Sequence, residues 1–282
     1  MNERNDFVIS ADSVRVPKII YGTAWKKDRT ALLVEQAITL GFRGIDTACQ
    51  PQHYDEPGVG AGLARALTSG LTRAEIYLQS KFTPLDGQDP DRLPYDPTAS
   101  LSEQVAQSFA SSRRHLQTDY LDCLILHSPL TIEKQLVEVW QAMETIFDDG
   151  GARQLGISNC YEFEELERLY RQARVKPAVV QNRFYAPNGY DREIRKFCRQ
   201  QGILYQSFWT LTANPKVLAH NTLQTLASHY RRTPAQIFFR YLTQIDIIPL
   251  TGTTSEIHMR EDLSIFDFEL RESERELVGR LL

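Results

Sequence analysis

The sequence of 282 residues predicts an α/β protein, a (β/α)8 TIM barrel with a small N-terminal β-hairpin, as a single domain over residues 1–282. Three observations favour this class. Eight short apolar runs recur along the chain, helix-like stretches lie between them, and most runs are apolar throughout instead of alternating with polar residues. Such runs are typical of strands buried on both faces in a parallel sheet covered by helices. The length also suits one barrel, which needs about 250 residues.

The predicted elements follow in a regular order. Phe7–Ile9 and Val14–Val16, joined by Ser-Ala-Asp-Ser, predict a hairpin that closes the bottom of the barrel. The predicted barrel strands are Lys18–Thr23, Gly44–Ala48, Ile76–Phe82, Tyr120–His127, Arg153–Ser158, Ala178–Phe184, Ile203–Phe208 and Asp246–Leu250.

Helices between these strands are predicted from apolar spacing and from start signals. One helical face collects Leu136, Val139, Trp140, Met143, Ile146 and Phe147. Capping boxes mark helix starts at Ser100–Glu103 and Thr233–Gln236, and Asn214-Pro215 marks another. A doubly wound dinucleotide-binding sheet is the competing fold. It would need Gly-x-Gly-x-x-Gly after its first strand, and Gly22-Thr-Ala-Trp does not supply that motif.

The stretch from Thr83 to Thr98 interrupts this regular pattern. It holds four prolines, together with Asp and Gly residues, and follows a predicted strand. Because long loops at the C-terminal ends of barrel strands are commonly functional, we expect a flap over the site.

Composition narrows the function. The formal net charge is −4, and no basic run interleaves with aromatic residues, which argues against nucleic acid as a partner. No stretch approaches the roughly 20 apolar residues of a membrane span, and the polar N-terminus does not resemble a signal peptide. Four cysteines lie scattered without CxxC spacing, which favours reduced thiols in the cytoplasm over disulfides or a zinc site.

Four residues whose side chains could take part in catalysis lie at or near three successive strand ends: Asp46, Tyr54, Lys81 and His127. Taken singly, each has an ordinary structural explanation, such as a loop cap for Asp46 or a half-buried ring for Tyr54. In a barrel, however, the C-terminal ends of strands meet at one mouth, so these four side chains are expected to converge.

Their chemistry is mutually consistent. A lysine beside a tyrosine favours the phenolate and lowers its pKa, and a carboxylate keeps that lysine charged and in place. A neutral imidazole can donate a hydrogen bond to a carbonyl oxygen. The set suits protonation of an oxygen on which negative charge develops, and it lacks the ligand number of a metal site. It is not a serine hydrolase either, because Gly156-Ile-Ser-Asn-Cys breaks the Gly-x-Ser-x-Gly motif.

The chain resembles the aldo-keto reductase superfamily, nicotinamide-dependent (β/α)8 oxidoreductases, as a short-tailed member. The resemblance covers about Pro17 to Leu270. It rests on Gly41-Phe-Arg-Gly-Ile-Asp-Thr-Ala, Ser80-Lys-Phe, Asp119-Tyr-Leu-Asp-Cys-Leu-Ile-Leu-His-Ser-Pro, Gly151-Ala-Arg-Gln-Leu-Gly-Ile-Ser-Asn, Val180-Gln-Asn and Ile265-Phe-Asp-Phe-Glu-Leu.

The resemblance implies a cytoplasmic carbonyl reductase that also oxidises alcohols. Tyr54 resembles the general acid, Lys81 and Asp46 its supporting pair, and His127 the imidazole that orients the carbonyl. Trp25, His127 and Ser128 are the implied substrate residues. The implied cofactor-binding residues are Gly22, Thr23, Asp46, Ser158, Asn159, Gln181, Phe208, Leu211, Thr251, Gly252, His258, Glu261 and Asp262. A small carbonyl compound is the expected partner, a monomer is favoured, and no metal is implied.

Departures from the family pattern shape three expectations. Leu250 and His258 stand where basic residues are usual, so NADP(H) is expected with weak discrimination against NAD(H). Ser128 replaces a common Trp and the tail is short, so we expect an open mouth for bulky carbonyls. Its walls are expected to be Trp25, Leu85, Tyr95, Phe184 and Tyr185.

The alternative hypothesis is that the protein is a non-catalytic regulatory or structural relative of the same family, although such a protein need not keep an acid–base pair.

Overall fold

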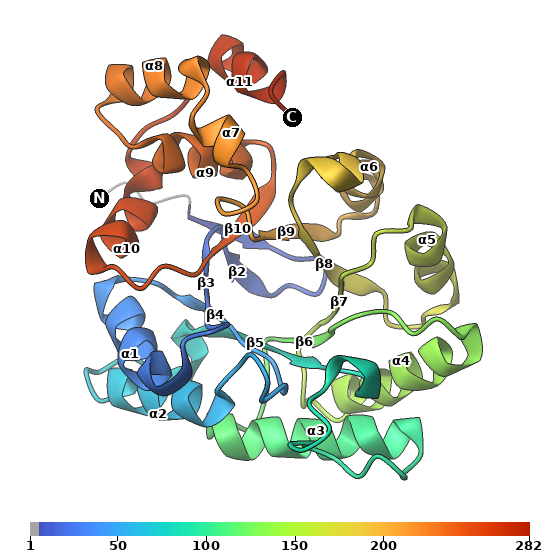
Figure 1. The fold of residues 1–282 in the computed structure, drawn as a ribbon. Coiled ribbons are helices and arrows are strands. Elements are labelled where there is room, and N and C mark those ends of the chain that lie inside the picture. The colour runs from blue at the N-terminus through green and yellow to red at the C-terminus, as the bar shows by residue number, and fades with distance from the viewer. Residues whose placement is uncertain (1–5) are drawn as a thin grey trace.

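A computed structural model describes residues 6–282 and shows eight parallel strands closed into a barrel (Figure 1). Each strand pairs with the next one in the chain, and β10 returns to pair with β3. The strands are β3 (Ile20–Gly22), β4 (Gly44–Asp46), β5 (Tyr77–Phe82), β6 (Cys123–Leu126), β7 (Leu155–Ser158), β8 (Pro177–Arg183), β9 (Leu204–Phe208) and β10 (Ile247–Thr251).

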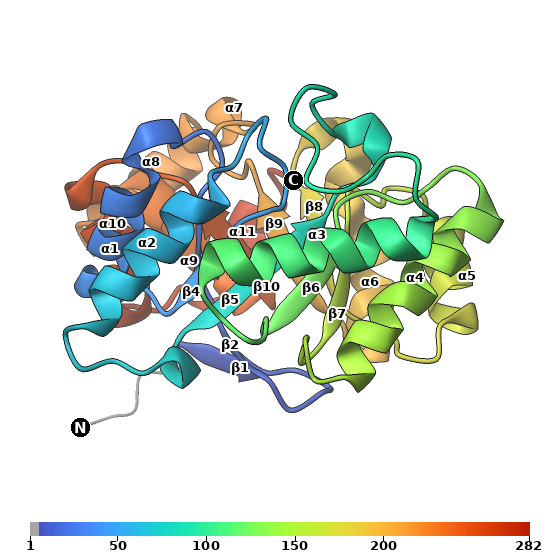
Figure 2. The same cartoon turned by 90° about the horizontal axis from the view of Figure 1, so that it is seen from below.

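Helices surround the barrel and cover its outer face (Figures 1 and 2). They are α1 (Thr30–Leu40), α2 (Glu56–Leu67), α3 (Leu101–Leu116), α4 (Glu133–Asp148), α5 (Phe163–Gln172), α6 (Arg192–Gln201), α7 (Pro215–Leu218), α8 (Asn221–Tyr230), α9 (Pro234–Gln244), α10 (Glu256–Leu263) and α11 (Glu272–Gly279). Short 3-10 turns lie at Lys27–Arg29, Arg73–Glu75, Leu85–Gly87, Ala186–Asp191 and Ser264–Asp267.

The predicted hairpin is confirmed and closes one end of the barrel. Strands β1 (Phe7–Ile9) and β2 (Arg15–Pro17) pair antiparallel. Val14 and Val16 are buried in an apolar cluster with barrel residues such as Ile20 and Tyr77. Figure 2 shows the hairpin at the edge opposite the loop that follows β5. This end therefore contributes stability and leaves the other end for function.

Every predicted barrel strand overlaps an observed strand, and the differences concern the ends. The fourth strand was predicted as Tyr120–His127 and spans Cys123–Leu126. It begins late because Asp122 pairs through its side chain: the carboxylate accepts from the Leu78 amide at 3.0 Å and forms an ion pair with Arg73 at 2.9 Å. Both predicted capping boxes are present, at α3 and α9.

The inside of the barrel has an apolar lower layer and a polar upper layer. Ile20, Ile125, Val179 and Ile248 fill the part nearest the hairpin. Towards the C-terminal strand ends the inner residues become polar and charged while staying buried. Buried polar groups are costly unless they are hydrogen-bonded, so this layer marks the functional end.

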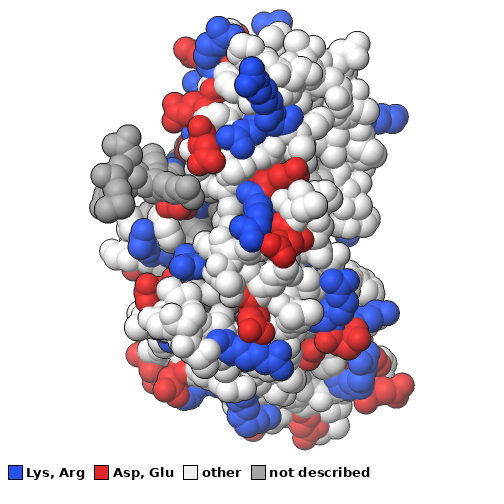
Figure 3. Space-filling model, turned by 90° about the vertical axis from the view of Figure 1, so that its left-hand side faces the viewer, with Lys and Arg blue, Asp and Glu red and all other residues white. Residues whose placement is uncertain are grey.

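The face shown in Figure 3 has no large patch of one charge, because acidic and basic side chains are interspersed on it. Within residues 6–282, no helix is both long and apolar enough to cross a membrane.

Candidate active site

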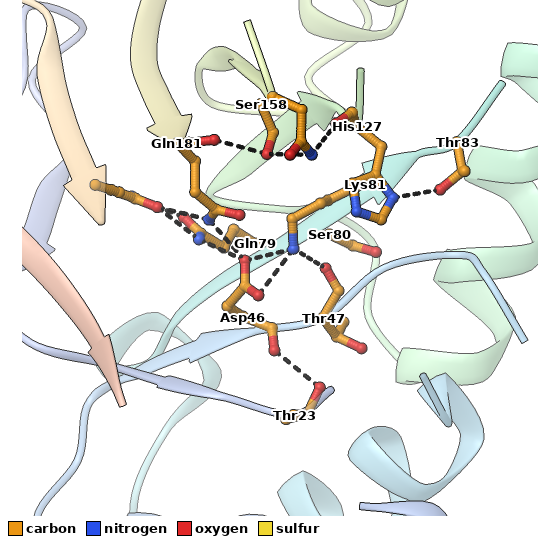
Figure 4. Close-up of polar contacts among 12 residues, drawn as sticks. Thr23, Asp46, Thr47, Gln79, Ser80, Lys81, Thr83, His127, Ser158 and Gln181 are labelled. Atoms are coloured by element: carbon orange, nitrogen blue, oxygen red, sulfur yellow. Dashed lines mark hydrogen bonds and ion pairs between the residues drawn. The ribbon is translucent and has the colours of Figure 1, made fainter. Parts of the chain in front are cut away.

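The polar upper layer is centred on five hydrogen-bonded inner side chains, most of which are labelled in Figure 4. Asp46 accepts at Oδ1 from Gln79 at 2.7 Å and from Gln181 at 2.9 Å. Gln206 accepts from both glutamines, at 2.8 and 2.9 Å, and donates back to Gln79. Lys81 is the fifth member. The amides of Gln79 on β5 and Gln181 on β8 hold the Asp46 carboxylate in one orientation, and Gln206 on β9 links these two amides.

Lys81 and Asp46 form a buried ion pair at the centre of this network. The Lys81 ammonium donates to Asp46 Oδ1 at 2.7 Å, to Oδ2 at 2.8 Å and to the Thr47 carbonyl at 2.9 Å. Burial alone would lower the pKa of Lys81, but Asp46 and Tyr54 outweigh it and raise the pKa above the ordinary value. The lysine is therefore charged throughout the physiological range.

Tyr54 reaches this pair from the loop between β4 and α2. Its ring centroid lies 5.1 Å from Lys81 Nζ. The position is held on both sides, since Tyr54 N donates to Gln50 O at 3.1 Å and the next residue, Asp55, caps α2 by accepting from Gly58 N. Gly58 is required there because a Cβ would lie 2.1 Å from Asp55 Oδ2.

The prediction that Lys81 lowers the pKa of Tyr54 below its ordinary value is wrong in this structure. Burial is the largest influence and raises the pKa; Lys81 lowers it and Asp46 raises it again, so the net shift is upward. Lys81 acts in the predicted direction but does not prevail. Tyr54 is consequently a neutral hydroxyl that holds its proton.

His127 lies directly after β6 and faces Tyr54, with their ring centroids 6.0 Å apart in an edge-on arrangement. Burial, followed by the charges of Lys81 and His53, lowers the pKa of His127 well below its ordinary value. The imidazole is therefore neutral, as the sequence predicted. Its Nδ1 lies 2.7 Å from Thr83 Oγ1, a contact that the sequence did not reveal.

The residues predicted for the nicotinamide end lie at the same barrel end. Thr23 donates to Asp46 O at 2.8 Å, and Ser158 donates to Gln181 O at 2.7 Å. Asn159 has φ +54°, a left-handed conformation that asparagine tolerates, and donates to His127 O at 2.8 Å. Three further predicted cofactor-binding residues are half-buried: Gly22, Phe208 and Leu211.

The residues predicted for the adenosine end gather around β10 and the start of α10. Thr251 donates to Asp262 at 2.7 Å, and burial raises the pKa of Asp262 to about 7. His258 Nδ1 lies 3.5 Å from Thr253 Oγ1. Lys26, which the sequence analysis missed, donates to Gly252 O from the loop after β3. Glu261 is half-buried beside this group.

Two of the five predicted mouth walls are wrong. Tyr95 is only 6% exposed because its ring packs on Phe82 and its hydroxyl donates to Thr83 O at 2.8 Å. Phe184 is fully buried, and its ring packs near Phe238 of α9, outside the barrel.

The other proposed walls remain accessible. Trp25 is 65% exposed and Leu85 is 46% exposed, while Tyr185 is half-buried. Ser128, the predicted substrate residue that replaces a bulky ring, is also half-buried. The Trp25 ring rests on His53, with the centroids 4.1 Å apart. Trp209, which was not predicted, adds a 52% exposed ring next to Phe208.

All four cysteines are free and buried. Burial raises the pKa of Cys49, and that thiol is packed as predicted. Among residues 6–282, no group of three or more His, Cys, Asp or Glu residues is arranged to hold a metal ion.

Comparison with known proteins identifies a family. A model described as the Aldo/keto reductase family matches residues 18–281. An uncharacterized oxidoreductase, YtbE of Bacillus subtilis (strain 168), is 31% identical over 88% of this chain and 82% of its own length. The glyoxal reductase of the same strain is 30% identical over the same shares. The solved structure of an aldo/keto reductase from Brucella melitensis superimposes with a TM-score of 0.83 at 26% identity, over 98% of this chain and 99% of its own.

Proposed function

The chain belongs to the aldo/keto reductase family and is an oxidoreductase, and we propose that it reduces an aldehyde or ketone with NADPH, Tyr54 acting as general acid. The observation that carries the proposal is the charged Lys81–Asp46 pair beneath a protonated Tyr54, with the neutral His127 facing the same hydroxyl-bearing ring. This arrangement can protonate an oxygen while stabilising the charge that develops on it.

The polar groups at the mouth fit a nicotinamide. Gln181 uses its amide nitrogen on Asp46 and Gln206, which leaves Oε1 to accept from a carboxamide. Ser158 and Asn159 lie beside it, and the half-buried Phe208 ring offers a face for stacking. When bound, the reduced nicotinamide supplies a hydride to a carbonyl carbon.

The residues of the chain then divide the remaining work. Tyr54 gives its proton to the carbonyl oxygen, and the Lys81 ammonium stabilises the phenolate that is left. Asp46 keeps the lysine in place through the contacts at 2.7 and 2.8 Å, since removing a partner from a buried ion pair is strongly unfavourable. His127 donates from Nε2 and orients the carbonyl towards Tyr54.

Thr83 can support the form of His127 that does this. In the tautomer with its proton on Nε2, Nδ1 is an acceptor, and the Thr83 hydroxyl at 2.7 Å is the donor that satisfies it. We expect Thr83→Val to lower kcat about 10-fold, the effect of one hydrogen bond of roughly 1–1.5 kcal/mol, with little change in cofactor affinity. Thr83→Ser keeps the hydroxyl and should restore kcat. Equal rates in the two variants would show that only packing matters at this position.

The basic residues that could bind the 2′-phosphate of NADP(H) depart most from the family pattern. Arg260 is engaged by Glu256 at 2.7 Å, which reduces its availability to a ligand. Lys26 and His258 remain beside the Gly252 turn, together with Ser255 at the start of α10. A lysine, a histidine and helix-end amides can hold a phosphate.

We therefore expect NADPH to bind more tightly than NADH, with Lys26 and His258 sharing the discrimination. Lys26→Met should reduce the ratio of the two dissociation constants about 10-fold, because one charge-assisted contact of roughly 1.5 kcal/mol is lost. His258→Ala should reduce it less. Titration calorimetry with both cofactors provides the measurement, and Lys27→Met, an exposed neighbour, is the control. Equal wild-type affinities for NADPH and NADH would contradict the phosphate site.

Consumption of reduced cofactor with 4-nitrobenzaldehyde tests the central proposal. A reductase oxidises NADPH in step with alcohol formation. A non-catalytic relative binds the cofactor, which calorimetry detects, but leaves the aldehyde unchanged, and that outcome would overturn the proposal. The exposed Trp25 and Leu85 and the small Ser128 favour bulky aromatic carbonyls over small ones. We also assign the protein to the cytoplasm, which four free cysteines support.

A further inference from the structure

Arg183 closes strand β8 and lies on its inner face. Side chains two residues apart in a strand point to the same side, so Arg183 follows Gln181, whose amide reaches Asp46 inside the barrel. One such step is about 6–7 Å along the strand. Arg183 also lies in register with Phe208 on β9. The arginine therefore stands at the mouth, above the polar layer.

The Arg183 guanidinium is surrounded by aromatic rings and has no anion. Its Cζ lies 4.2 Å from the Trp209 ring centroid, 5.4 Å from that of Tyr185 and 6.0 Å from that of Phe208. Within residues 6–282 its side chain forms neither an ion pair nor a hydrogen bond, and its Nε is buried without a partner. By contrast, the partly buried Arg73 and Arg240 each pair with a carboxylate.

Such a group is ready for an anionic ligand. A guanidinium is always charged and presents its N–H donors in its own plane. The Trp209 ring, at 4.2 Å from Cζ, lies within the range of a cation–π contact. Stacking on aromatic faces leaves the in-plane edges for a carboxylate, which arginine binds through two parallel hydrogen bonds. The 52% exposed Trp209, held at φ +59°, places a large apolar surface beside the charge.

The strand order indicates how a ligand would extend between Tyr54 and Arg183. In the closed order β10-β3-β4-β5-β6-β7-β8-β9, strand β8 stands opposite β4. Tyr54 comes from the loop after β4, so a carbonyl beside Tyr54 lies across the mouth from Arg183. A ligand that reaches both must separate its carbonyl from its anionic group by several atoms.

We propose that Arg183 recognises the carboxylate of the substrate, and that the preferred substrates are extended aldehydes or ketones carrying a carboxylate remote from the carbonyl. The inference rests on the proposed reductase function. Trp209 and Tyr185 form the apolar walls against which the body of the substrate packs. Short 2-oxo acids, in which the two groups are adjacent, cannot reach Tyr54 and Arg183 together.

A matched pair of substrates tests this. 4-Carboxybenzaldehyde and its methyl ester carry the same aldehyde on the same ring and differ in the charge. For the wild type, we expect kcat/KM to be about 10- to 100-fold higher for the acid, mainly through KM, because a charge-assisted bidentate contact is gained. The preference should decrease as salt is added.

Arg183→Leu should abolish the preference while leaving the ester within about twofold of wild type and NADPH affinity unchanged. Arg183→Lys keeps the charge without the planar fork and should retain part of it. Arg199→Leu removes one charge from the exposed face of α6 and is the control. A wild type that favours the ester, or a preference that survives in Arg183→Leu, would overturn the proposal. Loss of NADPH affinity in its place would assign Arg183 to the cofactor.

Failure of the proposed function is distinguishable from failure of this inference. If neither aldehyde is reduced, the reductase proposal fails. Calorimetric binding of the same two compounds to the wild type and to Arg183→Leu then decides the role of Arg183 by itself: selective binding of the acid that requires Arg183 supports it, and equal binding refutes it.

Discussion

Replacing Tyr54 with phenylalanine is expected to lower kcat for carbonyl reduction by about 10²–10⁴-fold, the usual contribution of a positioned general acid. The change removes one hydroxyl from a ring whose position is fixed by the Gln50 contact and the α2 cap. The affinity for NADPH, measured by calorimetry, should stay close to that of the wild type. A variant that retains cofactor binding and near wild-type turnover would exclude Tyr54 as the acid.

The pH dependence gives an independent readout of the same residue. Burial keeps the pKa of Tyr54 above its ordinary value of 10.0, and the pKa of His127 lies well below 6.5. Between these limits neither group titrates. The titration of Tyr54 or His127 should therefore not change the rate of reduction between about pH 7 and 9.

Alcohol oxidation should behave in the opposite way. It requires Tyr54 to accept a proton, so only the deprotonated fraction is active. That fraction grows about tenfold per pH unit below the pKa, and the oxidation rate should rise with it. Tyr54→Phe should lack this rising limb. An oxidation rate that is flat from pH 7 to 10 in the wild type would contradict the assignment of Tyr54 as the base.

The barrel could be predicted because its strands are buried on both faces. Runs such as Tyr120–His127, with Cys-Leu-Ile-Leu at its centre, and Asp246–Leu250 are apolar enough to stand out against the helices between them. The capping boxes predicted the starts of α3 and α9. Strand ends were harder to predict because they depend on tertiary contacts. Asp122 shortens β6 by pairing through its carboxylate with partners that lie about 45 residues away, which no local pattern records.

The candidate site was partly predictable for a topological reason. Residues at the C-terminal ends of parallel strands meet, so Asp46, Lys81 and His127 could be grouped without knowing any distance. Side-chain direction is a different matter. Arg183 faces inward and Phe184 outward because neighbours in a strand alternate, yet of these two only Phe184 was predicted to line the mouth.

Contacts between loops were also beyond sequence reasoning. Lys26 meets Gly252 across two loops that are far apart in the chain, and the Thr83 hydroxyl meets His127 from a neighbouring strand. The direction of the pKa shift of Tyr54 could not be predicted either. The lowering effect of Lys81 could be inferred from the sequence, whereas the larger, raising effect of burial depends on the packed structure.

The second large effect is expected at Lys81. Lys81→Met removes the charge that stabilises the Tyr54 phenolate, so kcat should fall by at least about 100-fold. It also leaves the Asp46 side chain buried among the amides of Gln79 and Gln181, without its cation. Breaking one side of a buried pair typically costs about 3–5 kcal/mol of folding free energy.

The double variant Asp46→Asn/Lys81→Met separates these two consequences. It removes both charges while an amide still fills the Asp46 position, so urea unfolding should show it to be more stable than Lys81→Met alone, since the unpaired buried carboxylate is gone. Its activity should remain as low as that of the single variant, because no ammonium is present to stabilise the phenolate. Recovery of activity together with stability would mean that Lys81 acts only by holding the fold. Recovery of stability alone would mean that the charge of Lys81 is needed for chemistry and not only for holding the fold.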